Sequence, residues 1–133
     1  MTWRKVTAII ISLSFFLVAC NNITTIETEE IRLMNFQAFG KADGELIKVI
    51  SDENEVKMIV KLIDGASKES GSVDMPEGDY TVELVSEDGE KEAYHLWLED
   101  AEAKGTIMAV KDTSTIYTLS KNKKEKLRTA LIN

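Results

Sequence analysis

The clearest pattern in the chain is a run of apolar residues with a period of about 3.6. These residues are spaced i, i+3, i+4 and i+7 and so share one face of a helix, which we expect over residues 52–64. Ser51 is expected to be its N-cap, because its hydroxyl can accept a hydrogen bond from a free backbone N–H of the first turn. Gly65 is expected to end the helix. The apolar residues are Val56, Ile59, Val60 and Ile63.

Apolar and polar residues alternate along most of the other segments, as is typical of strands with one buried face. Asp88-Gly89 separates two such segments and favours a hairpin turn, because both residues tolerate a positive φ. Ser120 is expected to cap a last helix over residues 121–131. The expected strands cover about 30–38, 45–50, 80–85, 94–99, 105–110 and 114–119.

The predicted elements follow one another in the order ββαββββα. Successive strands joined by hairpins, with helices packed to one side, are typical of the α+β class. We therefore expect one antiparallel sheet with the helices 52–64 and 121–131 packed on one face. A single domain over residues 31–133 contains all of these elements, and it is long enough for a hydrophobic core.

The first twenty residues follow a different pattern. Arg4 and Lys5 precede 14 uncharged residues, 6–19, which lead to the only cysteine of the chain, Cys20. A helix of that length extends about 21 Å, whereas the hydrocarbon core of a membrane needs about 30 Å. A basic start, a short apolar stretch and small residues before a cleavage point are typical of a signal peptide. Residues 1–19 are therefore predicted to be a signal peptide that is removed.

The sequence Leu17-Val18-Ala19-Cys20 resembles the lipobox of bacterial lipoproteins. The resemblance implies cleavage before Cys20 and attachment of lipid to its thiol. The expected location is then the outer face of a cell membrane, with membrane lipid as a partner through the acylated cysteine, since two or more acyl chains hold a protein stably. Residues 20–30 are expected to form a polar tether, although the isoleucines within it could instead begin a strand.

Charge narrows the classes of partner. Removal of Arg4 and Lys5 with the signal peptide leaves 14 of the 16 basic residues against 23 acidic ones, a formal net charge of −9. Binding of nucleic acid requires clustered lysine and arginine, so no nucleic-acid partner is expected. We interpret the acidic balance as a source of solubility.

The sequence carries little catalytic equipment. His95 is the only histidine, and no Gly-x-Ser-x-Gly motif accompanies it. Its place in an alternating strand predicts a structural or exposed residue on the face away from the core. One histidine and a lipidated cysteine cannot complete the usual ligand set of zinc. The acidic loop with Asp74, Glu77 and Asp79 matches no EF-hand spacing, so we expect no metal, no cofactor and no enzyme.

Two features indicate an interaction surface. Tyr94 and Trp97 lie three residues apart in a strand and so point to opposite faces. Trp97 then either anchors a partner, as tryptophan often does, or is covered by a helix or loop. The basic residues of the last helix could meet lipid headgroups or anionic wall polymer, or neighbouring acids could balance them. The candidate surface is Trp97, Lys121, Lys124 and Arg128.

These features favour a non-enzymatic, lipid-anchored module that binds an envelope protein or another envelope ligand through its sheet. The alternative is a small envelope hydrolase that uses two carboxylates. The 23 acidic residues permit many such pairs and so single out none. A binding protein for a transporter ranks last, because the chain is too short for two hinged lobes.

Three stretches of the chain carry a family resemblance. They are Ser72-Val73-Asp74-Met75 before Asp79-Tyr80, Tyr94-His95-Leu96-Trp97-Leu98, and Ile116-Tyr117-Thr118-Leu119-Ser120. Together they resemble the YhfM-like small lipoproteins of Bacillus and related Gram-positive bacteria, over residues 72–120 and more loosely over 45–131. The resemblance implies the same order of elements and a cell-surface location. It implies no activity and no functional residue.

Overall fold

The computed structural model of the protein describes residues 22–70 and 74–133. The predicted signal peptide and Cys20 lie outside the described residues. Within these ranges, no helix is long and apolar enough to cross a membrane. The elements of the described ranges are β1 (Thr28–Asn35), β2 (Leu46–Ile50), α1 (Glu53–Asp64), β3 (Ser67–Lys68), β4 (Tyr80–Ser86), β5 (Lys91–Trp97), β6 (Gly105–Ala109), β7 (Tyr117–Leu119) and α2 (Lys121–Ile132).

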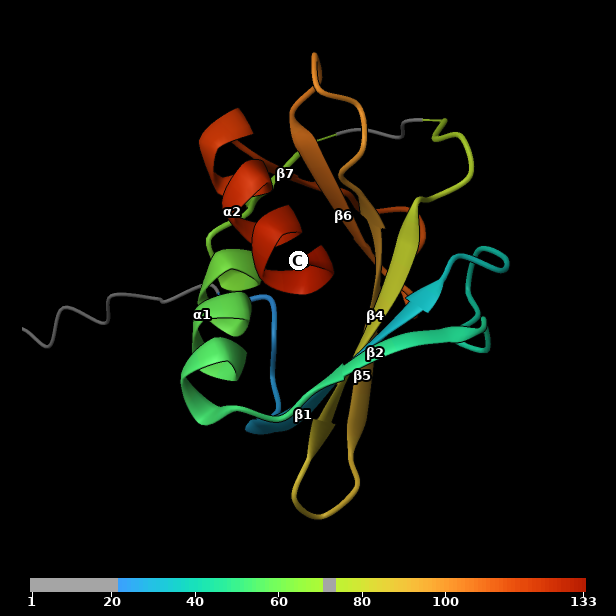
Figure 1. Ribbon diagram of the computed structural model, residues 1–133. Helices are drawn as coiled ribbons and strands as arrows, with labels where there is room; N and C mark the ends of the chain where they lie inside the picture. The colour runs from blue at the N-terminus through green and yellow to red at the C-terminus, as the bar shows by residue number, and fades with distance from the viewer. Residues whose placement is uncertain (1–21, 71–73) are drawn as a thin grey trace, which may run out of the picture.

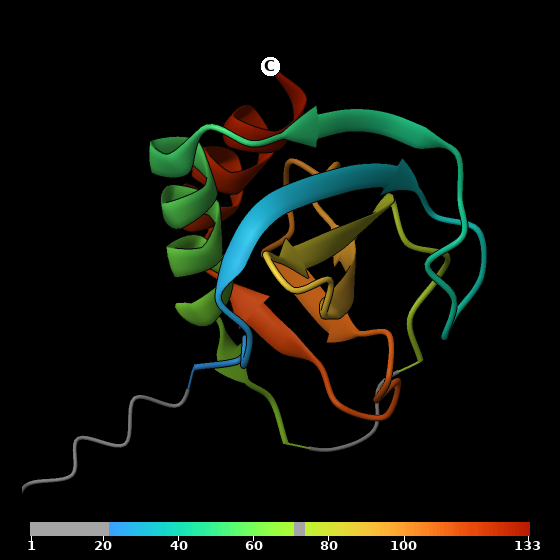
Figure 2. The same cartoon turned by 90° about the horizontal axis from the view of Figure 1, so that it is seen from below.

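The strands form one sheet in the order β2-β1-β4-β5-β6-β7-β3, and every neighbouring pair is antiparallel. Both helices lie on the same side of this sheet, which we call the inner face (Figure 1). The loop between β1 and β2 lies on the other side, the outer face (Figure 2). The predicted α+β class and order of elements are confirmed, with the two-residue strand β3 added at one edge of the sheet.

The main hydrophobic core lies between the inner face and the helices. Val56, Ile59 and Ile63 of α1 are buried, as the helical spacing predicts, and Leu127 and Leu131 of α2 join them. Alternate residues of the strands supply the opposite wall of the core. They include Ile31, Leu33, Ile50, Val82, Leu84, Tyr94, Leu96, Ile107 and Leu119.

The helix ends show one confirmed cap and one correction. Ser120 caps α2, because the backbone N–H of Lys123 donates to its hydroxyl at 3.3 Å. The prediction that Ser51 caps α1 is wrong. Asp52 is the N-cap, and its Oδ1 accepts from the backbone N–H of Glu55 at 3.0 Å. A carboxylate at this position satisfies the same free N–H and adds negative charge at the positive end of the helix dipole.

Turn chemistry sets the remaining strand boundaries. The Asp88-Gly89 turn joins β4 to β5 as predicted, with Gly89 at a φ of +88°. The first strand ends at Asn35 and does not continue to residue 38. The chain turns back over the outer face at that point, and the ring of Phe36 meets that of His95 with centroids 4.9 Å apart.

The segment before β1 is docked on the domain. Thr24 is 9% exposed, and both its N–H and its hydroxyl donate to the Asp64 carboxylate at 2.8 Å. The N–H groups of Thr25 and Ile26 donate to Oε1 of Glu92 at 2.7 and 2.9 Å. The predicted tether is therefore wrong for residues 23–30, because two carboxylates bind the backbone of this segment and its isoleucines pack against the core.

Candidate functional site

A second buried cluster lies on the outer face of the sheet. Met34 of β1 stands opposite Thr81 of β4, Thr81 opposite His95 of β5, and His95 opposite Met108 of β6. These four residues, which we call the His95 cluster, are at most 6% exposed. The loop between β1 and β2 covers them with aromatic rings packed edge-on against the histidine. The outer face is therefore partly a core of its own.

Hydrogen bonds fix the protonation of His95. Its Nε2 lies 3.1 Å from the backbone N of Gly40, which can only donate, so Nε2 is the unprotonated nitrogen. Nδ1 then carries the proton and donates to Oγ1 of Thr81 at 2.8 Å. Burial lowers the pKa of His95, which favours this neutral form. In this tautomer His95 cannot accept a proton from Thr81, so the pair does not form a nucleophile and base.

Trp97 lies on the outer face next to this cluster, opposite in direction to the core residue Tyr94. Its indole N–H donates to the carbonyl oxygen of Pro76 at 3.1 Å. Its ring stacks on Phe39, with centroids 6.1 Å apart. A loop thus covers part of Trp97, one of the two alternatives that the sequence left open, and the remainder stays exposed.

Exposed apolar side chains lie on the edge strand β2 and in the loop before it. Phe39, Leu46, Ile47 and Val49 are 42% to 54% exposed, and we call them the β2 edge patch. Val49 pairs with Arg32 on the outer face, and a register shift between Leu33 and Met34 places Leu46 opposite Met34 on the same face. Sequence analysis recognised the strand but missed the patch, because a single sequence does not show which strand lies at the edge.

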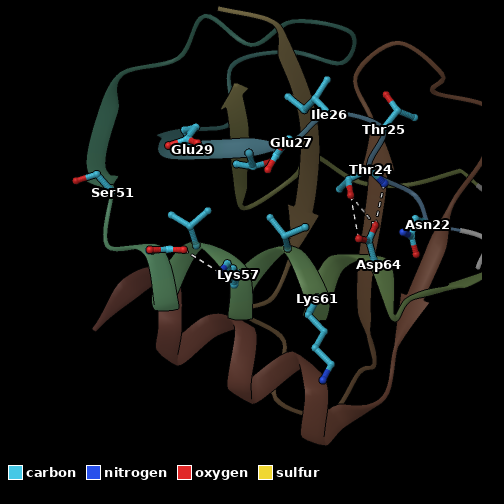
Figure 3. Close-up of a pocket in the computed structure, with 14 residues that line it drawn as sticks. Asn22, Thr24, Thr25, Ile26, Glu27, Glu29, Ser51, Lys57, Lys61 and Asp64 are labelled. Atoms are coloured by element: carbon cyan, nitrogen blue, oxygen red, sulfur yellow. Dashed lines mark hydrogen bonds and ion pairs between the residues drawn. The ribbon is translucent and has the colours of Figure 1, made fainter. Parts of the chain in front are cut away.

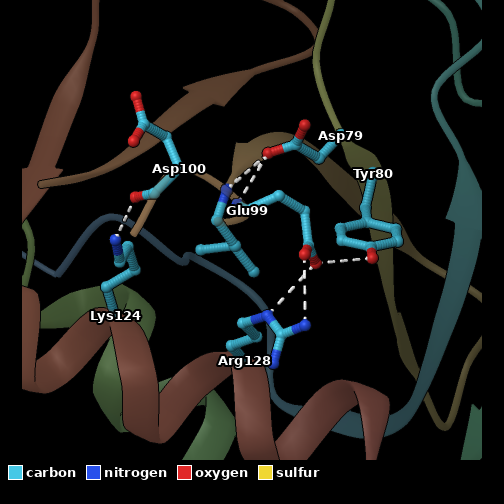
Figure 4. Close-up of polar contacts among 7 residues, drawn as sticks. Asp79, Tyr80, Glu99, Asp100, Lys124 and Arg128 are labelled. Carbon is cyan, nitrogen blue, oxygen red and sulfur yellow. Dashed lines mark hydrogen bonds and ion pairs between the residues drawn. The ribbon is translucent and has the colours of Figure 1, made fainter. Parts of the chain in front are cut away.

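The predicted basic surface on the last helix requires a correction. Lys124 is 1% exposed, and its ammonium donates to the carbonyl oxygen of Asp100 (Figure 4). It also donates to the carbonyl oxygen of Ala103 at 2.6 Å. It therefore does not lie on an interaction surface. Arg128 is partly exposed and is paired with Glu99, while Lys121 is exposed. The spacing of Lys124 with the buried residues of α2 was the available signal, since positions 124, 127 and 131 share one face of a helix.

A polar group at the ends of β4 and β5 is the nearest approach to a catalytic constellation (Figure 4). Glu99 accepts from the hydroxyl of Tyr80 at 2.7 Å and from two nitrogens of Arg128 at 3.2 and 3.1 Å. These hydrogen bonds lower the pKa of Glu99. Burial and the adjacent carboxylate raise the pKa of Tyr80 to about 12. Glu99 is thus ionised and cannot serve as a general acid near neutral pH.

The acidic loop with Asp74, Glu77 and Asp79, which matches no EF-hand spacing, has a structural role at its last residue. Oδ2 of Asp79 accepts from the backbone N–H groups of Leu98 and Glu99 at 2.7 and 3.0 Å, and so ties the start of β4 to the end of β5. Across residues 22–70 and 74–133, no group of three or more histidine, cysteine, aspartate or glutamate side chains is placed to hold a metal ion.

Helix α1 borders two surface hollows. One lies between α1 and the segment before β1, which we call the docked segment, where Thr24 binds Asp64 (Figure 3). The other lies between α1 and α2, and we call it the helix groove. Asp64 borders both hollows. The helix groove is lined by Met58, Lys61, Leu62, Asp64, Gly65, Lys123, Glu125, Lys126, Thr129 and Ala130.

The architecture places the protein in a class of α+β folds in which an antiparallel sheet carries its helices on one face. The crystal structure of a thioesterase-like protein from Clostridium sporogenes ATCC 15579 is similar, with a TM-score of 0.61 and 20% sequence identity. The similarity covers 83% of this chain and 99% of that chain. At this identity the similarity shows a shared fold.

The family follows from the sequence match. A family model described as YhfM protein matches residues 27–133, and the chain belongs to this family. The predicted membership of the YhfM family is confirmed, over a longer range than 45–131 that includes β1 and the loop over the His95 cluster. No match was found among curated proteins.

Proposed function

We propose that the protein is a lipid-anchored, non-enzymatic binding module on the outer face of a cell membrane, and that it holds a protein partner at the β2 edge patch. The distribution of exposed apolar residues supports this best. Of the five large apolar residues that are exposed in the described ranges, Leu46, Ile47 and Val49 lie on the edge strand β2, and Phe39 lies in the loop before it. Single exposed apolar residues are ordinary, whereas a gathered group is typical of an interaction site.

The β2 strand offers a partner both backbone and side-chain contacts. Within the described part of the chain it pairs with β1 alone, so one side of the strand presents unpaired N–H and C=O groups. An extended segment of a partner can add to such an edge, where backbone hydrogen bonds supply affinity and side chains supply selectivity. The stacked rings of Phe39 and Trp97 form a second apolar area at β5, which β1 and β4 separate from β2.

Crosslinking in intact cells tests the partner surface. A photoreactive amino acid at Ile47 is expected to capture one protein, identified by mass spectrometry. Val49→Lys is expected to abolish the capture, because it places an ammonium against an apolar partner. The same photoreactive amino acid at Lys104, an exposed position before β6, is the control and should capture nothing specific. Equal capture at both positions, or capture that survives Val49→Lys, contradicts the proposed surface.

The anchor is tested separately at Cys20. Cells fed a fatty acid with an alkyne tag are expected to label the native protein and to leave Cys20→Ser unlabelled. The variant is also expected to move from the membrane fraction to the medium, since loss of the acyl chains removes the membrane affinity. Labelling of Cys20→Ser would contradict the anchor and leave the β2 edge patch unaffected.

A second candidate is an envelope hydrolase that acts through Glu99. The observation in its favour is the similarity to a protein described as thioesterase-like. Against it, Tyr80 and Arg128 together occupy both oxygens of the Glu99 carboxylate. Hydrolysis of acyl thioesters by the purified protein, abolished by Glu99→Gln, would replace the binding proposal. No turnover in either form is the expected result.

A further inference from the structure

The docked segment sets the distance between the predicted anchor and the helices. Thr24 is bound to Asp64, the last residue of α1, by three hydrogen bonds of 2.8, 2.8 and 2.9 Å. From Cys20 to Thr24, a fully extended chain spans at most about 14 Å. A lipid on Cys20 therefore holds the C-terminal end of α1 close to the bilayer and does not let the domain stand far from it.

The helix groove opens at this same end of the molecule. The start of α2 lies beside the end of α1, because the Lys123 ammonium donates to the carbonyl oxygen of Gly65 at 3.4 Å. Asp64 borders the docked segment on one side and the groove on the other. The groove also carries an unusually exposed apolar residue, Met58, at 47%. Its apolar lining consists of Met58, Leu62 and Ala130.

Lysines surround this apolar lining. Lys61, Lys123 and Lys126 line the groove and outnumber its two acids, Glu125 and Asp64. The carboxylate of Asp64 accepts the hydrogen bonds of Thr24. Lysine side chains can lay their methylene stems along an apolar surface and extend their ammonium groups to phosphate. Apolar residues flanked by lysines are typical of helices that lie at the surface of an anionic bilayer.

We infer that the helix groove faces the bilayer that carries the Cys20 anchor, and that Lys61, Lys123 and Lys126 bind the phosphates of its anionic lipids. This inference rests on the lipid anchor of the proposed function and adds an orientation to it. The helical layer then lies between the bilayer and the sheet, and the outer face with the β2 edge patch points away from the membrane. The net acidic charge of the chain weakens this attraction, but charges more than about 10 Å apart are largely screened at 0.1 M ionic strength, so the lysines nearest the bilayer dominate.

Fluorescence quenching on vesicles tests the orientation. The full-length, lipidated protein is reconstituted in phosphatidylcholine vesicles, with or without phosphatidylglycerol, that contain lipids with a quencher near the headgroup. Lipidation consumes the thiol of Cys20, so an introduced cysteine is the sole site for a fluorophore. Met58→Cys places the fluorophore in the groove, and Lys41→Cys places it in the exposed loop of the outer face. Quenching is expected to be several-fold stronger at position 58, and stronger again with phosphatidylglycerol.

Charge reversal separates lipid binding from mere proximity. Lys61→Glu combined with Lys126→Glu is expected to reduce the quenching at position 58 in vesicles with phosphatidylglycerol, and Lys61→Gln with Lys126→Gln is expected to reduce it by less. The glutamine pair also serves if the glutamate pair does not fold. Equal quenching at positions 58 and 41, or no response to phosphatidylglycerol and charge reversal, overturns the inference.

Failure of the anchor gives a different result. The parent protein without an added cysteine would then take the fluorophore at Cys20 and would not float with the vesicles. That outcome overturns the lipid anchor and the orientation together, whereas a protein that floats with both positions equally quenched overturns the orientation alone.

Discussion

The two faces of the sheet are buried in different ways. The inner face presents aliphatic side chains at alternate positions, and two helices cover it. On the outer face a histidine and a threonine satisfy each other, and a loop provides the cover. The inner face depends on apolar area, which tolerates substitutions of similar volume. The outer face depends on individual hydrogen bonds, because an unpartnered buried polar group is costly. We therefore expect the outer face to contribute less to the free energy of unfolding than the inner face.

Truncation on the inner face should have the largest effect. Ile59 is fully buried in the main core, so Ile59→Ala is expected to lower the free energy of unfolding by about 2–5 kcal/mol through lost burial and a cavity. Urea unfolding followed by circular dichroism measures the change. Met58→Ala, at the neighbouring exposed position of the same helix, is the control and should change stability little. Equal losses in the two variants would mean that the helix does not pack as described.

Substitution of Lys124 tests whether the stability of the inner face also depends on a polar group. Lys124→Ala removes the donor for the carbonyl oxygens of Asp100 and Ala103 and leaves a cavity, so a loss of about 2–4 kcal/mol is expected. Lys124→Met keeps the buried stem and should recover part of the loss. Lys121→Ala, at the exposed start of α2, is the matched control. If Lys124→Ala left the free energy of unfolding unchanged, water would have replaced the ammonium as the hydrogen-bond donor.

The contrast between the faces also explains what the sequence could predict. Helix α1 and the Asp88-Gly89 hairpin depend on period and turn chemistry within a few residues, and both were predicted. The His95 cluster depends on contacts between distant segments, because Gly40 and His95 are 55 positions apart in the chain. No local pattern contains that contact. The burial of Lys124 was available from helical spacing, but its charge favoured an exposed position.

The β2 edge patch shows a second limit of prediction from the sequence. The residues of β2 have the composition of an ordinary buried strand, and the sequence does not show that its neighbour on one side is missing. The polar segment before β1, which is docked on the domain, shows a third limit. Its carboxylate partners, Asp64 and Glu92, lie far away in the chain. Each of these features is decided by which elements become neighbours, and this information is not carried by the period of apolar residues.

Substitution of His95 should cost less than Ile59→Ala and should act through hydrogen bonds. His95→Phe keeps a ring in the site but leaves the Gly40 N–H and the Thr81 hydroxyl without a partner, so a loss of about 1–3 kcal/mol is expected. Adding Thr81→Val should recover part of this loss, because it removes one of the unpartnered groups. If the double variant is less stable than the sum of the single variants predicts, packing and not hydrogen bonding controls the outer face.

The same variant tests the outer face through the pH dependence of stability. Burial lowers the pKa of His95 in the folded state, so the unfolded chain, with an ordinary pKa of about 6.5, takes up a proton first as the pH falls. The free energy of unfolding should therefore decrease below about pH 6.5 until the lowered folded pKa is reached. Urea unfolding of the native protein and of His95→Phe over this range should show a steeper decrease in the native protein, because the carboxylates contribute equally to both. Equal slopes would mean that His95 is not held neutral.

The smallest effect is expected at Glu99, which lies at the border between sheet and helices. Its side chain is 37% exposed and that of Arg128 is 34% exposed, so water screens much of their attraction. Glu99→Gln should retain the hydrogen bond from Tyr80 and cost only a fraction of the His95→Phe effect. Because hydrogen bonds lower the pKa of Glu99, its favourable contribution is present at neutral pH and is lost as the pH falls through that lowered pKa. The free energies of unfolding of the variant and the native protein should therefore differ at neutral pH and converge in acid.

A large loss of stability in Glu99→Gln at neutral pH would instead show that the Glu99–Arg128 pair ties α2 to the sheet. If Glu99→Gln changes stability little, the fold is intact, and an assay of its hydrolytic activity decides directly between the binding module and the hydrolase.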